Sequence, residues 1–193
     1  MRKFGIITLI FSTILMSCNT DKSKTKIENP EFTKTEQKTD TLTKHIKSFN
    51  PELPTIGLLM YNGVLQSEVT ATSDVFAKPT EDGKQLFNVI SIAETESQIT
   101  TEEGMHFVPD YTFENCPKLT ALFVPSAYDM YAQVNNDRIV NFIREKNKET
   151  KYTVSNCAGA QLIGKSGIAD GHKIVTWIGG GEQLQKDYPN LKV

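Results

Sequence analysis

The 193-residue sequence has little excess charge, few histidines, no repeated segment and no apolar run long enough for a comfortable membrane span. Its 21 basic and 23 acidic residues give a formal net charge of −2, which argues against a nucleic-acid-binding surface. With 3 histidines and 3 cysteines it shows no pattern typical of a metal site, and we expect neither a metal nor another cofactor. The chemistry must therefore depend on a small number of side chains.

The N-terminus has the features of a bacterial export signal. Arg2 and Lys3 precede a short apolar stretch, Phe4–Met16. The following Leu15-Met-Ser-Cys18 resembles the lipobox of bacterial lipoproteins, in which cleavage leaves the cysteine as an acylated first residue. We expect residues 1–17 to be a lipoprotein signal peptide and Cys18 to carry the lipid, palmitate included. An ordinary cleaved signal peptide is the alternative.

Residues 18–53 are predicted to form a flexible polar tether. The segment consists largely of Lys, Thr, Glu, Asn and Asp, and its isolated apolar residues follow no helical or strand period. Such a stretch buries too little surface to offset its chain entropy. We expect it to hold a domain in the cell envelope, outside the cytoplasm and lipid-anchored to a bacterial membrane. His45 lies in this tether and is expected to be idle.

Residues 54–193 alternate between apolar runs and amphipathic segments, a pattern typical of a strand–helix repeat. The apolar runs predict strands at 55–61, 86–92, 119–124, 151–155 and 173–177, and residues 98–107 predict a hairpin. Helical spacing occurs at 64–76, 136–146 and 158–164. Near-continuous apolar strands are buried on both faces, so this order predicts an α/β three-layer sandwich with a mostly parallel sheet.

Cys157 lies where the 151–155 strand gives way to the 158–164 helix, and Ala158 and Gly159 follow it directly. A side chain on such a sharp turn projects from the top of the sheet. The helix start behind it offers unpaired N–H groups, and these favour a thiolate over a thiol. The pattern predicts a nucleophile elbow.

Three motifs in order resemble the ThiJ/PfpI (DJ-one) superfamily. They are the elbow Val154-Ser-Asn-Cys-Ala-Gly-Ala160, the first helix within Gly63–Phe76, and Leu122-Phe-Val-Pro125 at the end of a strand. The resemblance covers 54–193 and implies a flavodoxin-like fold related to class I glutamine amidotransferases. The branch it resembles most is that of isonitrile-hydratase-like and regulator-type domains.

The resemblance also assigns a partner to the cysteine. Glu68 matches the acidic residue of the family's first helix, whose carboxyl hydrogen-bonds the cysteine sulfur and tunes it. The helix pattern agrees, because Glu68 borders the apolar stripe formed by Leu65, Val69 and Thr72, where a carboxylate needs a partner. A half-exposed surface glutamate is the alternative.

The remaining site residues are the expected oxyanion and binding groups. The N–H of Ala158 is the natural first donor, and a second would come from the turn after Pro125, near Ser126 and Ala127, where the family usually has glycines. Trp177 is expected to be a pocket wall or a core residue.

No histidine stands where many family members place one beside the thiol. The domain contains only His106 and His172, and His172 lies in an Asp-Gly turn. Chemistry would then depend on the pair Cys157 and Glu68. Cys116 precedes the 119–124 strand, at the end away from the elbow, so a bridge to Cys157 is not expected and oxidation of Cys157 itself is favoured.

The C-terminus resembles the family's loop and short helix, and the further strands and closing helix of the family do not follow. We expect closing elements to be missing and hypothesise that a homodimer partner stabilises the domain. The sequence predicts a cysteine-dependent hydratase or hydrolase of a small electrophilic molecule. A ligand-binding or thiol-redox-sensing domain without turnover is the alternative.

Overall fold

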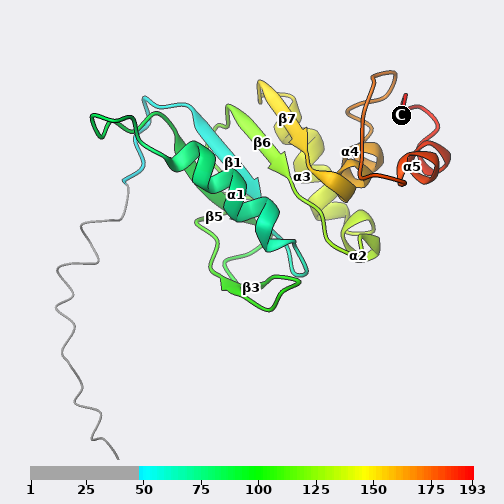
Figure 1. Ribbon diagram of the computed structural model, residues 1–193, viewed down its shortest axis with the longest axis horizontal. Helices are drawn as coiled ribbons and strands as arrows, with labels where there is room; N and C mark the ends of the chain where they lie inside the picture. The colour runs from blue at the N-terminus through cyan, green and yellow to red at the C-terminus, as the bar shows by residue number, and fades with distance from the viewer. Residues whose placement is uncertain (1–47) are drawn as a thin grey trace, which may run out of the picture. The chain divides into compact units, whose positions relative to one another are not determined.

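The computed structural model describes residues 48–193, and Lys47–Val193 forms one compact unit (Figure 1). The expected signal peptide, the lipidation of Cys18 and most of the tether lie outside the described residues. A five-stranded sheet with the order β5-β2-β1-β6-β7 forms the centre, and every pairing in it is parallel. Its strands are β1 (Thr55–Leu59), β2 (Asn88–Ala93), β5 (Tyr111–Thr112), β6 (Ala121–Val124) and β7 (Tyr152–Ser155).

The central strand β1 is buried along its whole length, as its apolar sequence predicts. It pairs with β2 on one side and β6 on the other. Gly57 lies where packing is closest, because a Cβ there would come within 2.7 Å of Ile92 Cδ1 and 2.8 Å of Leu119 Cδ1. This packing fixes the strand ends that carry the site.

Helices cover both faces of the sheet, which confirms the expected α/β fold. The crossover through α1 (Gln66–Ala77) leads from β1 outward to β2, and the crossover through α3 (Asp137–Asn147) leads from β6 in the opposite direction to β7. Since such crossovers are right-handed, the two helices lie on opposite faces. Figure 1 shows α1 in front of the sheet and α3 behind it.

The amphipathic pattern of α3 is confirmed in detail. Its apolar side is buried, and consists of Ile139, Val140, Phe142 and Ile143. Asn136 caps the helix start, because its side-chain oxygen accepts hydrogen bonds from the N–H groups of Arg138 and Ile139.

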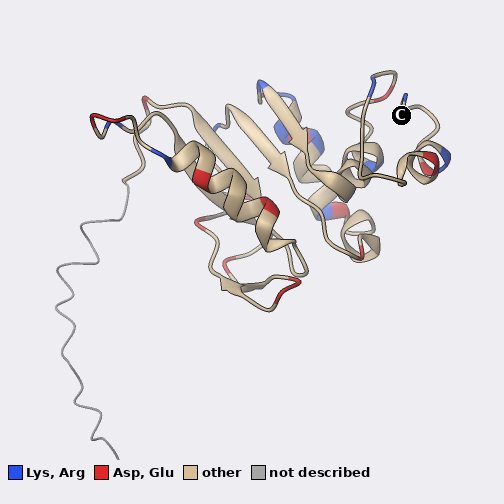
Figure 2. Cartoon of the chain, viewed as in Figure 1, with Lys and Arg blue, Asp and Glu red and all other residues tan. Residues whose placement is uncertain are grey.

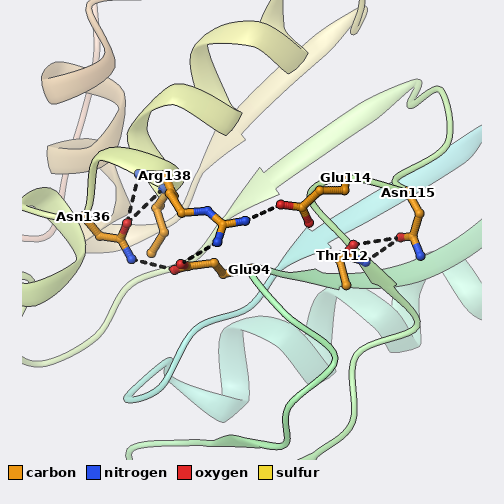
Figure 3. A network of polar contacts seen from close by, with 7 residues as sticks. Glu94, Thr112, Glu114, Asn115, Asn136 and Arg138 are labelled. Atoms are coloured by element: carbon orange, nitrogen blue, oxygen red, sulfur yellow. Dashed lines mark hydrogen bonds and ion pairs between the residues drawn. The ribbon is translucent and has the colours of Figure 1, made fainter.

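A polar network joins the start of α3 to the ends of β2 and β5 (Figure 3). The guanidinium of Arg138 lies 3.3 Å from a carboxylate oxygen of Glu94 and also pairs with Glu114. The side-chain amide of Asn136 donates to Glu94 over 2.8 Å. Thr112 donates to the side chain of Asn115 through its N–H and its hydroxyl. The network holds together three loops at the carboxyl edge of the sheet.

The expected hairpin is present, while the expected strand at 173–177 is wrong. Strands β3 (Ile99–Thr100) and β4 (His106–Phe107) pair antiparallel. Residues 173–177 form a single bridge, between Lys173 and Lys192, and Val175 is 83% exposed. This segment folds back along the C-terminal residues instead of joining the sheet, so its apolar run is not buried.

The C-terminal part consists of short helices packed under the elbow. The elbow begins with a 3-10 turn, η3 (Cys157–Gly159), followed by α4 (Ala160–Ser166), and α5 (Gly181–Asp187) packs below through Leu184. The short α2 (Tyr131–Val134) precedes α3. None of the helices in 48–193 combines the length and apolar character that crossing a bilayer requires.

Basic residues gather at the α3–β7 loop, whereas acidic residues lie on α1 and near the β3–β4 hairpin (Figure 2). The positive charge of that loop is locally balanced. Lys146 pairs with Glu149 at 2.8 Å and Lys148 pairs with Glu145 at 2.6 Å.

Candidate active site

Cys157 occupies the sharp turn between β7 and the η3–α4 helical segment. Its φ of 46° makes it the one non-glycine residue with positive φ between residues 48 and 193. This left-handed conformation costs an L-residue about 1–2 kcal/mol, and the fold maintains it here. The side chain is exposed. The structure therefore has the strand-to-helix turn that the sequence predicts, with its cysteine accessible.

Gly159 allows the elbow to press against the end of β6. A Cβ at this position would lie 2.3 Å from the carbonyl oxygen of Val124 and 2.8 Å from that of Pro125. Backbone oxygens cannot retreat as a flexible side chain can, so only glycine fits. This contact fixes Cys157 relative to the turn that carries Ser126.

Glu68 lies in the first turn of α1, half-buried as its position beside the apolar stripe predicts. Its two carboxylate oxygens accept hydrogen bonds from Ser126. The N–H of Ser126 donates to Oε2 and the hydroxyl donates to Oε1, each over 2.7 Å. Within residues 48–193 no hydrogen bond joins Glu68 to the Cys157 sulfur, so the carboxylate is directed to Ser126 in this structure.

Tyr61 is a neighbour that the sequence analysis did not single out. Its hydroxyl donates to the carbonyl oxygen of Pro125 over 2.5 Å. Burial, and then the negative charge of Glu68, raise the pKa of Tyr61 above its ordinary value. The available signal was its place at the end of a buried strand, where a tyrosine hydroxyl needs a partner.

The predicted oxyanion donors differ in whether their N–H groups already have an acceptor. Ala158 is buried at the start of η3, where helix N–H groups lack an intrahelical partner. The N–H of Ser126 already donates to Glu68, and that of Ala127 lies 3.1 Å from the sulfur of Met130. Donation by Ser126 to a substrate would need Glu68 to release it, and stays a prediction.

The segment after α4 contacts the elbow through Thr176. The Thr176 hydroxyl donates to the carbonyl oxygen of Cys157 over 3.0 Å. The neighbouring Trp177 is half-buried, packs against the core and covers Gly180, where a Cβ would meet its ring at 2.3 Å. Trp177 is thus a packing residue, and a second role as pocket wall stays a prediction.

Neither described histidine contacts the proposed pair. His172 is exposed in its turn, and His106 on β4 lies 3.1 Å from the hydroxyl of Thr100. No hydrogen bond connects either ring to Cys157 or Glu68 in the part of the chain that the structure describes. The same part contains no group of three or more His, Cys, Asp or Glu side chains suited to a metal.

Cys116 and Cys157 are both free thiols. Burial raises the pKa of the Cys116 thiol to about 11. Cys116 therefore remains protonated at neutral pH. Its side chain is partly buried, whereas that of Cys157 is exposed.

The Cys157 side chain is exposed to solvent. Cys157 and Glu68 do not line the four best-formed cavities described for residues 48–193, which have volumes of about 310 to 610 Å³. A substrate of Cys157 would approach from the surface.

The parallel sheet and its cysteine-bearing turn define an α/β protein of the glutamine amidotransferase-like type. Residues 54–190 match the DJ-1/PfpI family, and the chain belongs to that family. It is 26% identical over 121 residues to the isonitrile hydratase of Pseudomonas putida, a match that covers 63% of this chain. The aligned part spans 51% of that relative, about half of its length.

Solved structures agree on the fold. A ThiJ/PfpI family protein from Pseudomonas syringae has a TM-score of 0.57 and 24% identity, covering 68% of this chain and 57% of its own. DJ-1beta of Drosophila melanogaster has a TM-score of 0.60 and 15% identity, with 72% of each chain covered. At these identities the similarity shows the fold alone.

Proposed function

We propose that this chain is a cysteine-dependent hydratase or hydrolase acting on a small electrophilic molecule. The observation that carries the proposal is the positive φ of Cys157 on an elbow that leaves its side chain exposed. A fold that maintains this strain presents the sulfur at the sheet edge, where nucleophiles act in proteins with such turns. The distant similarity to an isonitrile hydratase supports a nitrile-like or carbonyl substrate.

The proposed chemistry has two steps. The Cys157 thiolate adds to the carbon of a nitrile-like substrate, and the electron pair of the broken π bond goes to the nitrogen, which the Ala158 N–H stabilises and which takes a proton from solvent. Water then attacks the same carbon and gives a proton to the Glu68 carboxylate. The C–S bond breaks with its electron pair returning to the sulfur as thiolate, and Glu68 returns its proton to solvent. Glu68 is the proton acceptor because neither described histidine contacts the pair.

A second candidate is a ligand-binding or thiol-redox-sensing domain of the same fold. The exposure of the Cys157 side chain favours it, because water-excluding walls assist covalent catalysis. A panel of small nitriles, isonitriles, amides and aldehydes, assayed with wild type and Cys157→Ser, separates the two. Turnover that Cys157→Ser abolishes supports the enzyme. Oxidation or alkylation at Cys157 with no turnover of any compound supports the sensor.

We further propose that the domain is lipid-anchored through Cys18 in the cell envelope. The lipobox-like sequence supports this location, and the polar segment that follows would serve as the tether. Metabolic labelling with palmitate should mark the wild type and spare Cys18→Ala. Equal labelling of both would contradict the anchor.

A further inference from the structure

The turn after β6 makes an unusually complete set of contacts with the start of α1. Ser126 is fully buried, and its carbonyl oxygen accepts from the N–H of Leu65 over 2.8 Å. Its N–H and hydroxyl donate to the two oxygens of Glu68, each over 2.7 Å. One residue thus binds the first turn of α1 at three points.

We propose that Ser126 is a positioning residue that holds Glu68 as an oriented proton acceptor. The proposal rests on the role given to Glu68 in the proposed function. In this proposal the Ser126 hydroxyl binds one carboxylate oxygen of Glu68, and the Ser126 N–H binds the other. The backbone N–H alone would hold only one of the two oxygens.

Two donors on two different oxygens constrain the direction of a carboxylate. Hydrogen bonds to an ionised acceptor are about twice as strong as neutral ones. Each oxygen retains a second lone pair, because a carboxylate has about four acceptor sites. Glu68 can therefore be clamped and still accept a proton.

The surrounding framework makes the clamp rigid. Pro125, directly before Ser126, accepts from the buried hydroxyl of Tyr61 and lies against Gly159 of the elbow. The clamp and the elbow thus share one support. A glycine at position 126 would keep the N–H contact to Glu68 and lose the hydroxyl contact.

Other titratable groups lie near the start of α1. Tyr61, two residues after β1, is protonated at neutral pH, and the negative charge of Glu68 contributes to its raised pKa. Glu103, in the β3–β4 turn, accepts from the N–H of Gln66 at the same helix start. Cys157 lies at the elbow. Within residues 48–193 only Ser126 donates hydrogen bonds to the Glu68 carboxylate.

The test follows the hydrogen bonding of the Glu68 carboxylate directly in the full chain. Carboxyl-labelled glutamate is incorporated, the Glu68 carbon signal is assigned with Glu68→Gln, and its chemical shift is recorded by carbon NMR at neutral pH. In Ser126→Ala the Glu68 signal should move from its wild-type position, since one of two charge-assisted donors is lost. Ser126→Gly removes the same hydroxyl and should move the signal in the same direction.

Ser166→Ala is the matched control. Ser166 is also buried, and its hydroxyl donates to the carbonyl oxygen of Ile163 over 2.8 Å, so its loss removes one buried hydrogen bond elsewhere. It should leave the Glu68 carbon signal unchanged. Glu68 signals in both Ser126 variants that coincide with those of wild type and Ser166→Ala would overturn the proposal.

A second measurement separates this inference from the proposed function. The rate of Cys157 alkylation is recorded against pH for wild type, Glu68→Gln and Ser126→Ala. Alkylation rates that change in Glu68→Gln, and in the same direction in Ser126→Ala, support both. A moved NMR signal in Ser126→Ala with alkylation rates that Glu68→Gln leaves unchanged supports the clamp and contradicts the pairing of Glu68 with Cys157.

Discussion

At the scale of single residues, Cys157 combines accessibility with a backbone conformation that works against stability. Its φ of 46° lies in the left-handed region, where a Cβ crowds the following carbonyl. Gly159, two residues after Cys157, is also needed for this turn, because only glycine lets the elbow approach the end of β6. The strained backbone lowers the stability of the protein at the position where the proposed reaction needs the sulfur.

Replacing Cys157 by glycine should therefore stabilise the protein relative to Cys157→Ala. We expect the free energy of unfolding of Cys157→Gly to be higher by about 0.5–1 kcal/mol, because glycine adopts positive φ without steric cost. Urea unfolding followed by circular dichroism measures the difference. A glycine variant less stable than the alanine variant would show that the elbow is unstrained.

The sequence identified Cys157 and Glu68 but not the contact that Glu68 makes. The elbow could be predicted because a strand pattern, a cysteine and two small residues stand in a row. The carboxylate of Glu68 and the hydroxyl of Ser126 are 58 positions apart, and their meeting depends on how α1 docks on β6. Helical periodicity predicts which face of a helix a residue occupies. It does not predict which distant residue that side chain contacts.

At the scale of elements, α3 depends on its cap as well as on its apolar side. Asn136 accepts from Arg138 and Ile139 and donates to Glu94, so it connects the helix start to the end of β2 (Figure 3). The exposed ion pairs of Arg138 add little by themselves, since water screens them.

Asn136→Ala should lower the free energy of unfolding by about 1–2 kcal/mol, since it leaves two helix N–H groups without their acceptor. Asn136→Ser keeps a capping acceptor without placing a second carboxylate against Glu94, and should recover part of the loss. Asn135→Ala serves as control, because that exposed side chain donates only to Tyr131 and should change stability by less than about 0.5 kcal/mol. Equal effects of the two alanine variants in thermal unfolding would refute the capping role.

The strand and helix predictions succeeded where an apolar pattern coincided with burial in the sheet. The four patterns at 55–61, 86–92, 119–124 and 151–155 all became parallel strands, each shorter than predicted, although β2 ends one residue later, at Ala93. The 173–177 pattern failed because it has no strand beside it, and Ile178 next to it is 99% exposed. Apolar alternation shows strand propensity and does not ensure a pairing partner.

At the scale of the whole molecule, the partly buried Cys116 links stability to alkaline pH. Burial raises the pKa of its thiol to about 11 in the folded state, above the value of about 8.5 for an unfolded thiol. The folded protein then retains this proton longer than the unfolded chain. The contribution is complete below about pH 8.5 and is lost as pH rises toward about 11.

The stability difference between wild type and Cys116→Ala should consequently shrink between pH 9 and 11. The thiol is partly exposed, so we expect a change of no more than about 1–2 kcal/mol. Comparing the two proteins cancels the parallel effect of Tyr61, whose raised pKa acts in the same direction. Urea unfolding at several pH values measures it, and a constant difference would contradict the assignment.

The central claim is that the fold activates Cys157 as a nucleophile. The most direct test compares its alkylation by iodoacetamide at pH 6 in the folded full chain and in the same chain denatured by urea, with mass spectrometry locating the label. An ordinary thiol is only about 0.3% thiolate at this pH, so activation is readily seen. We predict that Cys157 reacts at least about tenfold faster in the folded chain than in the denatured one. A folded rate equal to or below the denatured rate would show that the elbow merely exposes a cysteine.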